Sequence, residues 1–99
     1  MHPDPRAIAS VVFDDGNERE LARHHVTVGE VLEILDNEPL WRRNRRDRAG
    51  NRQAIGRTNG GRLLTVVALW ESSTKTLRPI TAWDASQAER ASYLASGRR

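Results

Sequence analysis

The stretch from residue 52 to residue 82 constrains the fold most, because it predicts three consecutive antiparallel strands. Asn59-Gly60-Gly61 supplies the residues that a tight hairpin needs, since the central positions of such a turn take φ > 0. The run from 63 to 70 is almost continuously apolar, which predicts a strand that is covered on both faces. Such a strand needs a helical layer on at least one side. The expected strands cover 53–58, 62–70 and 76–82.

Three residue pairs elsewhere have the spacing of a capping box, in which an N-cap side chain and a residue three positions later satisfy the first backbone N–H groups of a helix. The pairs are Asp15 with Glu18, Thr27 with Glu30, and Ser86 with Glu89. They predict a helix over about 16–24, a second that starts at 27 and ends within 36–39, and a third from 86 to about 95. In the second, four apolar residues at helical spacing predict the buried stripe: Val28, Val31, Leu32 and Leu35.

A further strand is expected over 8–13, so the predicted order is β-α-α-β-β-β-α. That strand is expected beside 76–82, because strands separated by helices often pair out of sequence. Residues 40–51 are rich in arginine and poor in packing residues, which favours a long loop or irregular edge. We therefore predict an α+β fold of one domain, 1–99, with frayed ends at 1–6 and 96–99. Its antiparallel sheet packs against acidic helices and carries arginines on its other side.

Composition excludes several classes of protein. The 99 residues include no cysteine, which excludes disulfide and thiol chemistry and fits a reducing compartment. No apolar run approaches the ~18 residues of a membrane span, and the N-terminus lacks the apolar segment of a signal peptide. We expect a cytoplasmic protein that does not bind membranes.

Charge is segregated along the chain, although the net charge is only +3. Residues 14–38 contain eight acids and two arginines, whereas residues 42–62 contain eight arginines and one acid, Asp47. Guanidinium is a planar fork of donors that suits phosphates and carboxylates. A GC-rich genome explains why fifteen of the sixteen basic residues are arginine, but it does not explain why the arginines cluster.

An ordered set of short motifs runs from Phe13 to Tyr93. The motifs are Phe13-Asp14, Asn17, Leu21, Arg23-His24, Val26-Thr27, Glu30-Val31, Asn51-Arg52, Ile55-Gly56, Gly61-Arg62-Leu63-Leu64, Val66-Val67, Leu77-Arg78, Ile80-Thr81-Ala82, Ala85-Ser86, Glu89-Arg90 and Tyr93. Taken in this order, they resemble BrnT-type toxins. The resemblance implies a RelE/ParE-like fold and a metal-independent endoribonuclease that cleaves mRNA and inhibits translation and growth. It also implies a cognate antitoxin with a DNA-binding domain, through which alone the pair contacts operator DNA. No cofactor is expected.

The chain departs from that family at several positions. Trp83 stands where an arginine is common, and Gln87 and Ala88 stand where the family has lysine or arginine. Pro79 replaces a usual isoleucine and predicts an edge strand or a bulge. The lost cations favour an alternative function, a non-catalytic module of the same fold whose arginine face holds a protein partner or nucleic acid.

Cleavage of RNA without a metal needs a base for the 2′-OH, cations for the phosphorane and an acid for the leaving oxygen. Arg52, Arg62 and Arg78 belong to the three meander strands and are expected to converge as a phosphate clamp. The alternative is three solvated arginines on the open side of the sheet. A register slip of one residue would exchange the two faces.

Two further residues are candidates for proton transfer. His24 matches the family, and histidine is the side chain best suited to acid–base catalysis near neutral pH, although many histidines simply end helices. Tyr93 could stack a base or move a proton, and the alternative is a half-buried packing residue. No metal site is expected, because the adjacent side chains of His24 and His25 point about 100° apart on a helix.

The remaining candidates are binding residues. Four arginines are expected to follow an RNA backbone or to accept an acidic antitoxin segment: Arg42, Arg43, Arg45 and Arg46. Trp83 could stack a base or belong to a partner interface. Arg90 could pair with a helix acid or with the antitoxin, while Glu89 is expected to cap its own helix.

Overall fold

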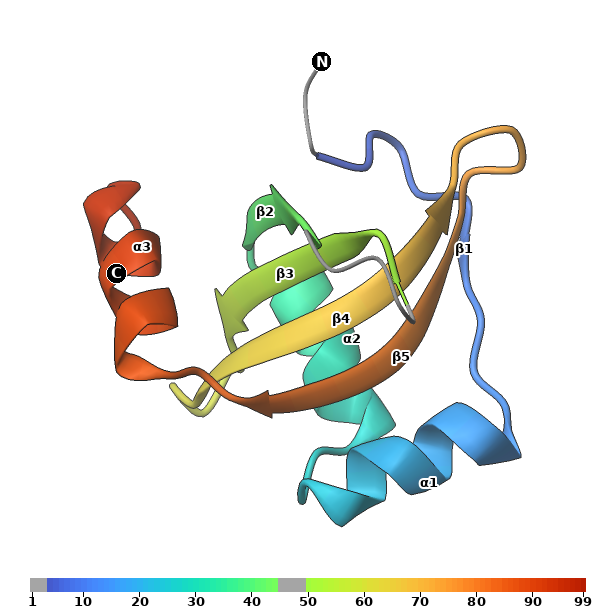
Figure 1. Cartoon of the computed structure of the whole chain (residues 1–99), viewed down its shortest axis with the longest axis horizontal. Helices are drawn as coiled ribbons and strands as arrows, with labels where there is room; N and C mark the ends of the chain where they lie inside the picture. Colours follow the sequence, from blue (N-terminus) through green and yellow to red (C-terminus); the bar gives the residue numbers. More distant parts are fainter. Residues whose placement is uncertain (1–3, 45–49) are drawn as a thin grey trace.

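The computed structural model describes residues 4–44 and 50–99, so Arg45 and Arg46 of the predicted RNA-binding set lie outside the described residues. Five strands form one sheet in the order β1-β5-β4-β3-β2, and three helices pack around it (Figure 1). The elements are β1 (Ser10–Val11), α1 (Asp15–Arg23), α2 (Val28–Asp36), β2 (Leu40–Arg43), β3 (Arg52–Arg57), β4 (Leu63–Glu71), β5 (Thr76–Asp84) and α3 (Gln87–Ala95).

The predicted α+β class and the predicted pairing of the first strand with the last are confirmed. The sheet is mixed rather than wholly antiparallel, because β1 runs parallel to β5 while β2, β3, β4 and β5 pair antiparallel. β1 is also shorter than expected, with two residues in place of 8–13.

The prediction of a loop or irregular edge from 40 onward is wrong for its first residues, which form β2. Leu40 pairs with Ile55 and packs against the cluster that includes Tyr93. Trp41 pairs with Ala54 and packs against the main core on the other face. Because alternate residues of a strand point to opposite faces, these two apolar side chains anchor both sides of a short strand despite the arginines that follow.

Two of the three predicted capping boxes are present, at Thr27 with Glu30 and at Ser86 with Glu89. The box predicted at Asp15 with Glu18 is wrong, because Asp14 is the N-cap and Asn17 is its partner. Asn17 has a second role that the local pattern did not reveal. Its side-chain amide donates to the main-chain oxygen of Pro79 at 2.9 Å and so ties the start of α1 to β5.

The buried side of α2 is rotated from the predicted stripe. Val31 and Ile34 are fully buried, whereas Leu32 is 45% exposed. Ile34 contacts the sheet at Gly56, where an added Cβ would lie 2.8 Å from the Ile34 Cγ2 atom. The close approach of α2 to β3 therefore depends on a residue without a side chain.

β4 is buried on both faces from Leu63 to Ala68, as its apolar run predicts. Its Leu64 and Val66 side chains belong to the core beneath α1 and α2, and Leu63 packs with Tyr93 of α3 on the opposite face. Opposite Val67 and Ala68 the register of β5 shifts by one residue beside Pro79, which confirms the predicted bulge. Within 4–44 and 50–99, no helix has the length and apolar character needed to cross a membrane.

Candidate functional site

Arg62 is held by this chain's own acids. Its Nε donates to Asp84 Oδ1 at 2.8 Å and its Nη2 to Asp84 Oδ2 at 3.2 Å, and Nη1 lies 3.3 Å from both Glu30 oxygens. The same Nη1 donates to the carbonyl oxygen of His25 at 2.7 Å. The hydrogen bonds with Asp84 raise the pKa of Arg62 and lower the pKa of Asp84. Arg62 therefore joins the end of β5 to the start of α2, and its charge is compensated within the chain.

Arg78 is also paired, in this case with Asp14 at the N-cap of α1. The backbone N–H of Asn17 lowers the pKa of the Asp14 carboxyl most, and the Arg78 guanidinium lowers this pKa further. The pair links β5 to the start of α1.

The predicted convergence of Arg52, Arg62 and Arg78 on one patch is wrong. Arg52 pairs with Ala68 and Arg78 pairs with Leu69, and adjacent residues of β4 point to opposite faces of the sheet. The two strand arginines therefore project to opposite faces, and Arg62 lies at the helix side with its two carboxylates. The sequence could not reveal this, because the acids at helix starts and strand ends come to lie beside the arginines only when the helices and strands pack together. Whether each arginine has a functional role stays a prediction.

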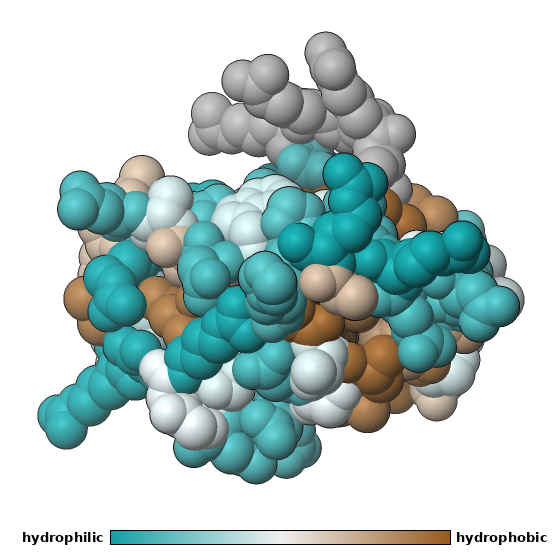
Figure 2. Space-filling view, turned by 90° about the horizontal axis from the view of Figure 1, so that it is seen from below, coloured by the Kyte–Doolittle hydropathy of each residue, from teal (hydrophilic) through white to brown (hydrophobic). Residues whose placement is uncertain are grey.

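His24 ends α1 and lies at the side of a cleft between α1 and β5. Its Nε2 atom is 3.3 Å from Glu20 Oε2, and Thr81 donates from Oγ1 to the same oxygen at 3.1 Å. The cleft, which we call the α1–β5 cleft, has a volume of about 470 Å³. Hydrophilic residues cover most of this side of the molecule, with small apolar areas between them (Figure 2). The residues that line the cleft are Gly16, Asn17, Glu20, Arg78, Ile80 and Thr81.

Tyr93 is a packing residue, which is the alternative left open by the sequence. Its exposed fraction is 4%, and it packs with Ile55 and Leu63. The guanidinium carbon of Arg57 lies 5.8 Å from its ring centroid, which is the geometry of a cation–π contact. A ring buried in this way has no open face for a base, so the expectation that Tyr93 stacks a base is wrong.

Three arginines surround α3 and the residues that follow it. Arg42 donates to Gln53 Oε1 at 2.9 Å and to Ser92 Oγ at 3.3 Å. Arg98 donates to the main-chain oxygen of Glu38 at 2.9 Å and to Ser96 Oγ at 3.0 Å.

Arg57, the third, donates to the main-chain oxygens of Gly61 at 2.9 Å and Arg99 at 3.0 Å. We call the set of Arg42, Arg57 and Arg98 the α3 arginine surface. The acceptors described for Arg42 and Arg98 carry no charge, so their guanidinium groups are oriented without being neutralised.

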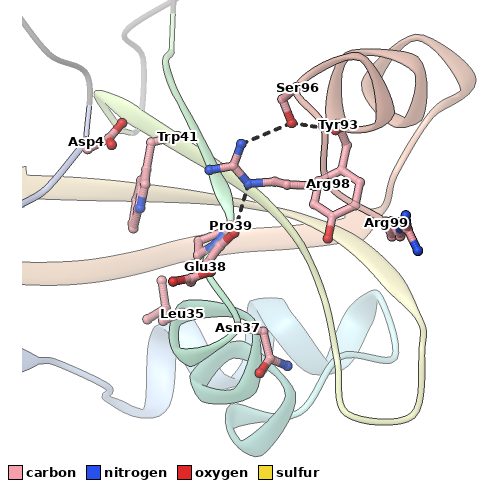
Figure 3. Close-up of a pocket in the computed structure, with 11 residues that line it drawn as sticks. Asp4, Leu35, Asn37, Glu38, Pro39, Trp41, Tyr93, Ser96, Arg98 and Arg99 are labelled. Carbon is pink, nitrogen blue, oxygen red and sulfur yellow. Dashed lines mark hydrogen bonds between the residues drawn. The ribbon is translucent and has the colours of Figure 1, made fainter.

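A groove of about 710 Å³ opens beside this surface (Figure 3). It lies between the end of α2, β2 and the residues after α3, and the Arg98 side chain extends into it between Trp41 and Tyr93. Trp41 is partly exposed there. We call it the Trp41 groove. Its lining residues are Asp4, Leu35, Asn37, Glu38, Pro39, Trp41, Tyr93, Ser96, Gly97, Arg98 and Arg99.

The other predicted binding residues lie apart from one another. Arg43 is exposed at the end of β2, where it pairs with Arg52, and Arg90 is exposed on α3. Trp83 donates from its indole nitrogen to Glu89 Oε1 at 3.1 Å. Burial raises the pKa of Glu89, but the N–H of Ser86 and the Trp83 indole outweigh burial, so the pKa is lowered overall. Glu89 caps α3 as predicted.

Sequence patterns pointed to the arginines but not to the residues that pair with them. Asp84 gave no signal, because it stands between a strand and a capping box and resembles an ordinary turn residue. Arg98 was assigned to a frayed tail, although two hydrogen bonds hold it. The described residues contain no group of three or more His, Asp or Glu side chains placed to bind a metal ion.

No protein-family model matches the chain, and no curated protein matches it. The likeness to BrnT-type toxins and the RelE-like topology therefore remain predictions from the motifs.

Proposed function

We propose that the chain is a non-catalytic, toxin-like binding module that holds RNA on its α3 arginine surface. The observation that carries this proposal is the difference in arginine partners. Arg62 and Arg78 are paired with carboxylates, whereas Arg42 and Arg98 are oriented by uncharged oxygens beside α3.

Electrostatics favour the α3 side for a polyanion. A phosphate that approached Arg62 would also approach Asp84 and Glu30, whose negative charges repel it. Transfer of the guanidinium from these acids to the phosphate would leave two carboxylates without their partner. At the α3 arginine surface a phosphate adds charge-assisted hydrogen bonds without displacing an acid from Arg42 or Arg98.

The test measures the affinity for a labelled single-stranded RNA of about ten nucleotides over a range of salt concentrations. Three arginines in contact with phosphates predict that log K falls with log[salt] with a slope of about −2. Arg42→Gln with Arg98→Gln should weaken binding and reduce the slope by about 1.4, because each contact on a single strand contributes about 0.7.

The matched control is Arg19→Gln with Arg23→Gln, which removes the same charge from α1. Both of these arginines are exposed, and the Arg23 side chain contacts Glu20. The control should keep the wild-type slope. An equal loss of RNA affinity in both double variants would show that binding depends on net charge alone, and would overturn the proposed surface.

A second candidate function, the endoribonuclease toxin, is favoured by the α1–β5 cleft. Glu20 and Arg78 line this cleft, and His24 contacts Glu20 at its side. Glu20 or His24 could accept the 2′-OH proton and Arg78 could stabilise the phosphorane. Arg78 would first have to exchange Asp14 for the substrate. In this function the proposed partner is an antitoxin with a DNA-binding domain, and mRNA is the substrate.

Induced expression in bacteria tests the second candidate. Growth arrest with cleaved RNA, lost in Glu20→Gln and in Arg78→Gln but kept in Arg19→Gln, would support catalysis in the cleft. Continued growth with intact RNA would exclude the nuclease and leave the binding module. Thermal unfolding of each variant shows whether a lost effect is a lost fold.

A further inference from the structure

The Trp41 groove contains two chemically different parts side by side. One part is the ring of Trp41, and the other is the guanidinium of Arg98, which extends between Trp41 and Tyr93 (Figure 3). A volume of about 710 Å³ is within the range of small-molecule sites. The groove is separate from the α1–β5 cleft, because the two share no lining residue.

Trp41 is fixed on one side and open on the other. Its position in β2, paired with Ala54, directs it toward the main core, against which it packs. Trp41 is nevertheless partly exposed, and it lines the groove. A ring held in this way loses little conformational entropy when a planar ligand stacks on its exposed part.

Arg98 is similarly held in place and keeps donors for a ligand. Its Nε and Nη1 atoms donate to the Glu38 main-chain oxygen and to Ser96 Oγ. A guanidinium has five N–H groups, so the two on Nη2 remain for an anion within the described contacts. The Ser96 hydroxyl is itself fixed by donation to the main-chain oxygen of Tyr93.

The acidic side chains of the groove argue against a bare anion as its ligand. Glu38 lines the groove together with Arg98 and lowers the affinity for inorganic phosphate, which brings no donor group to compensate this carboxylate. The same carboxylate can accept a hydrogen bond from a ribose hydroxyl or a base amino group. A ribonucleotide combines a planar base, a hydroxyl donor and a phosphate, and so fits the ring, the carboxylate and the guanidinium together.

We propose that the Trp41 groove binds one unpaired ribonucleotide of an RNA strand, with the base on Trp41 and the phosphate at Arg98. This inference rests on the proposed RNA binding and adds a preference for single strands. A base in a duplex is stacked on both faces and cannot reach Trp41, whereas an unpaired base can. The α3 arginine surface alone would bind both forms.

The test compares a single-stranded RNA with a duplex of the same length on the wild type and on two variants of Trp41. The wild type should prefer the single strand, and Trp41→Leu should lower single-strand affinity about tenfold while duplex affinity stays unchanged. Trp41→Phe keeps an aromatic face and should keep the preference. Trp70→Leu is the matched control, because it removes a tryptophan outside the groove.

Arg98→Gln keeps the inference testable if Trp41→Leu fails to fold, since Arg98 is not part of the core. It should lower single-strand affinity more than duplex affinity, and Arg42→Gln should lower the two equally. If the wild type binds RNA but all variants retain one ratio of single-strand to duplex affinity, the base site is overturned and the proposed function stands. If the wild type binds no RNA, both fall.

Discussion

The two sides of the molecule hold their arginines in different ways. Near the starts of α1 and α2, Arg62 and Arg78 each meet a carboxylate of this chain. Beside α3, Arg42 and Arg98 are oriented by amide, hydroxyl and main-chain oxygens. A carboxylate beside a guanidinium cancels most of the positive potential that would attract an anionic ligand. A neutral oxygen in the same place leaves most of that potential intact. The charge of the acceptor, rather than the number of arginines, decides which guanidinium groups the chain itself neutralises.

Among the arginine variants, the largest effect on stability is expected from Arg62→Ala. This change leaves Asp84, Glu30 and the His25 carbonyl oxygen without their donor, and should lower the free energy of unfolding by about 2 kcal/mol. Arg42→Ala, which removes bonds to uncharged oxygens, should cost less than about 1 kcal/mol. Urea unfolding measures both. Equal losses would remove the distinction between the two sides.

An acid-induced loss of stability should follow from Asp84. Its pKa is lowered from 3.8 in the folded chain, chiefly by the hydrogen bond from Arg62. Because the folded pKa lies below the unfolded pKa, the contribution is complete above 3.8 and is lost as pH falls through the folded pKa. Urea midpoints measured downward from neutral pH should fall less steeply in Asp84→Asn than in the wild type. Parallel curves would contradict the pairing.

A smaller effect is expected at the other carboxylate pair. Arg78→Gln removes one of the causes that lower the pKa of Asp14, but leaves the larger one, the backbone N–H of Asn17. The pKa of Asp14 should therefore rise and still remain below its ordinary value. An NMR titration of the side-chain carboxyl measures this shift, with Arg19→Gln as the control. An unchanged Asp14 would show that Arg78 is not bound to it in solution.

The smallest effect is expected from Tyr93→Phe. The ring that packs with Ile55 and Leu63 is kept, so both stability and RNA affinity should change little. Tyr93→Ala should instead destabilise the chain by about 3 kcal/mol, because it empties the space under α3. If Tyr93→Phe specifically lost RNA cleavage, the Tyr93 hydroxyl would be assigned a role in proton transfer.

Local sequence patterns predicted those features of the fold whose stabilising contacts lie within one short segment. The capping boxes at Thr27 and Ser86 were found because their hydrogen bonds join residues three apart. The start of α1 was misplaced because Asn17 also bonds to Pro79, which is 62 residues away. β2 was missed for a similar reason, since its apolar residues are explained only by the layers on either side of them.

The amino-acid sequence alone specified the meander, the position of its first turn, two helix starts and the segregation of acids from arginines. These features depend on interactions between close neighbours or on a periodic pattern, so they are visible in one dimension. Packing decided which arginines are neutralised. Arg62 meets acids 22 and 32 residues away, and Arg78 meets one 64 residues away. Coulombic attraction acts over a few ångströms, so residues this far apart in the sequence attract one another only after the fold brings them together.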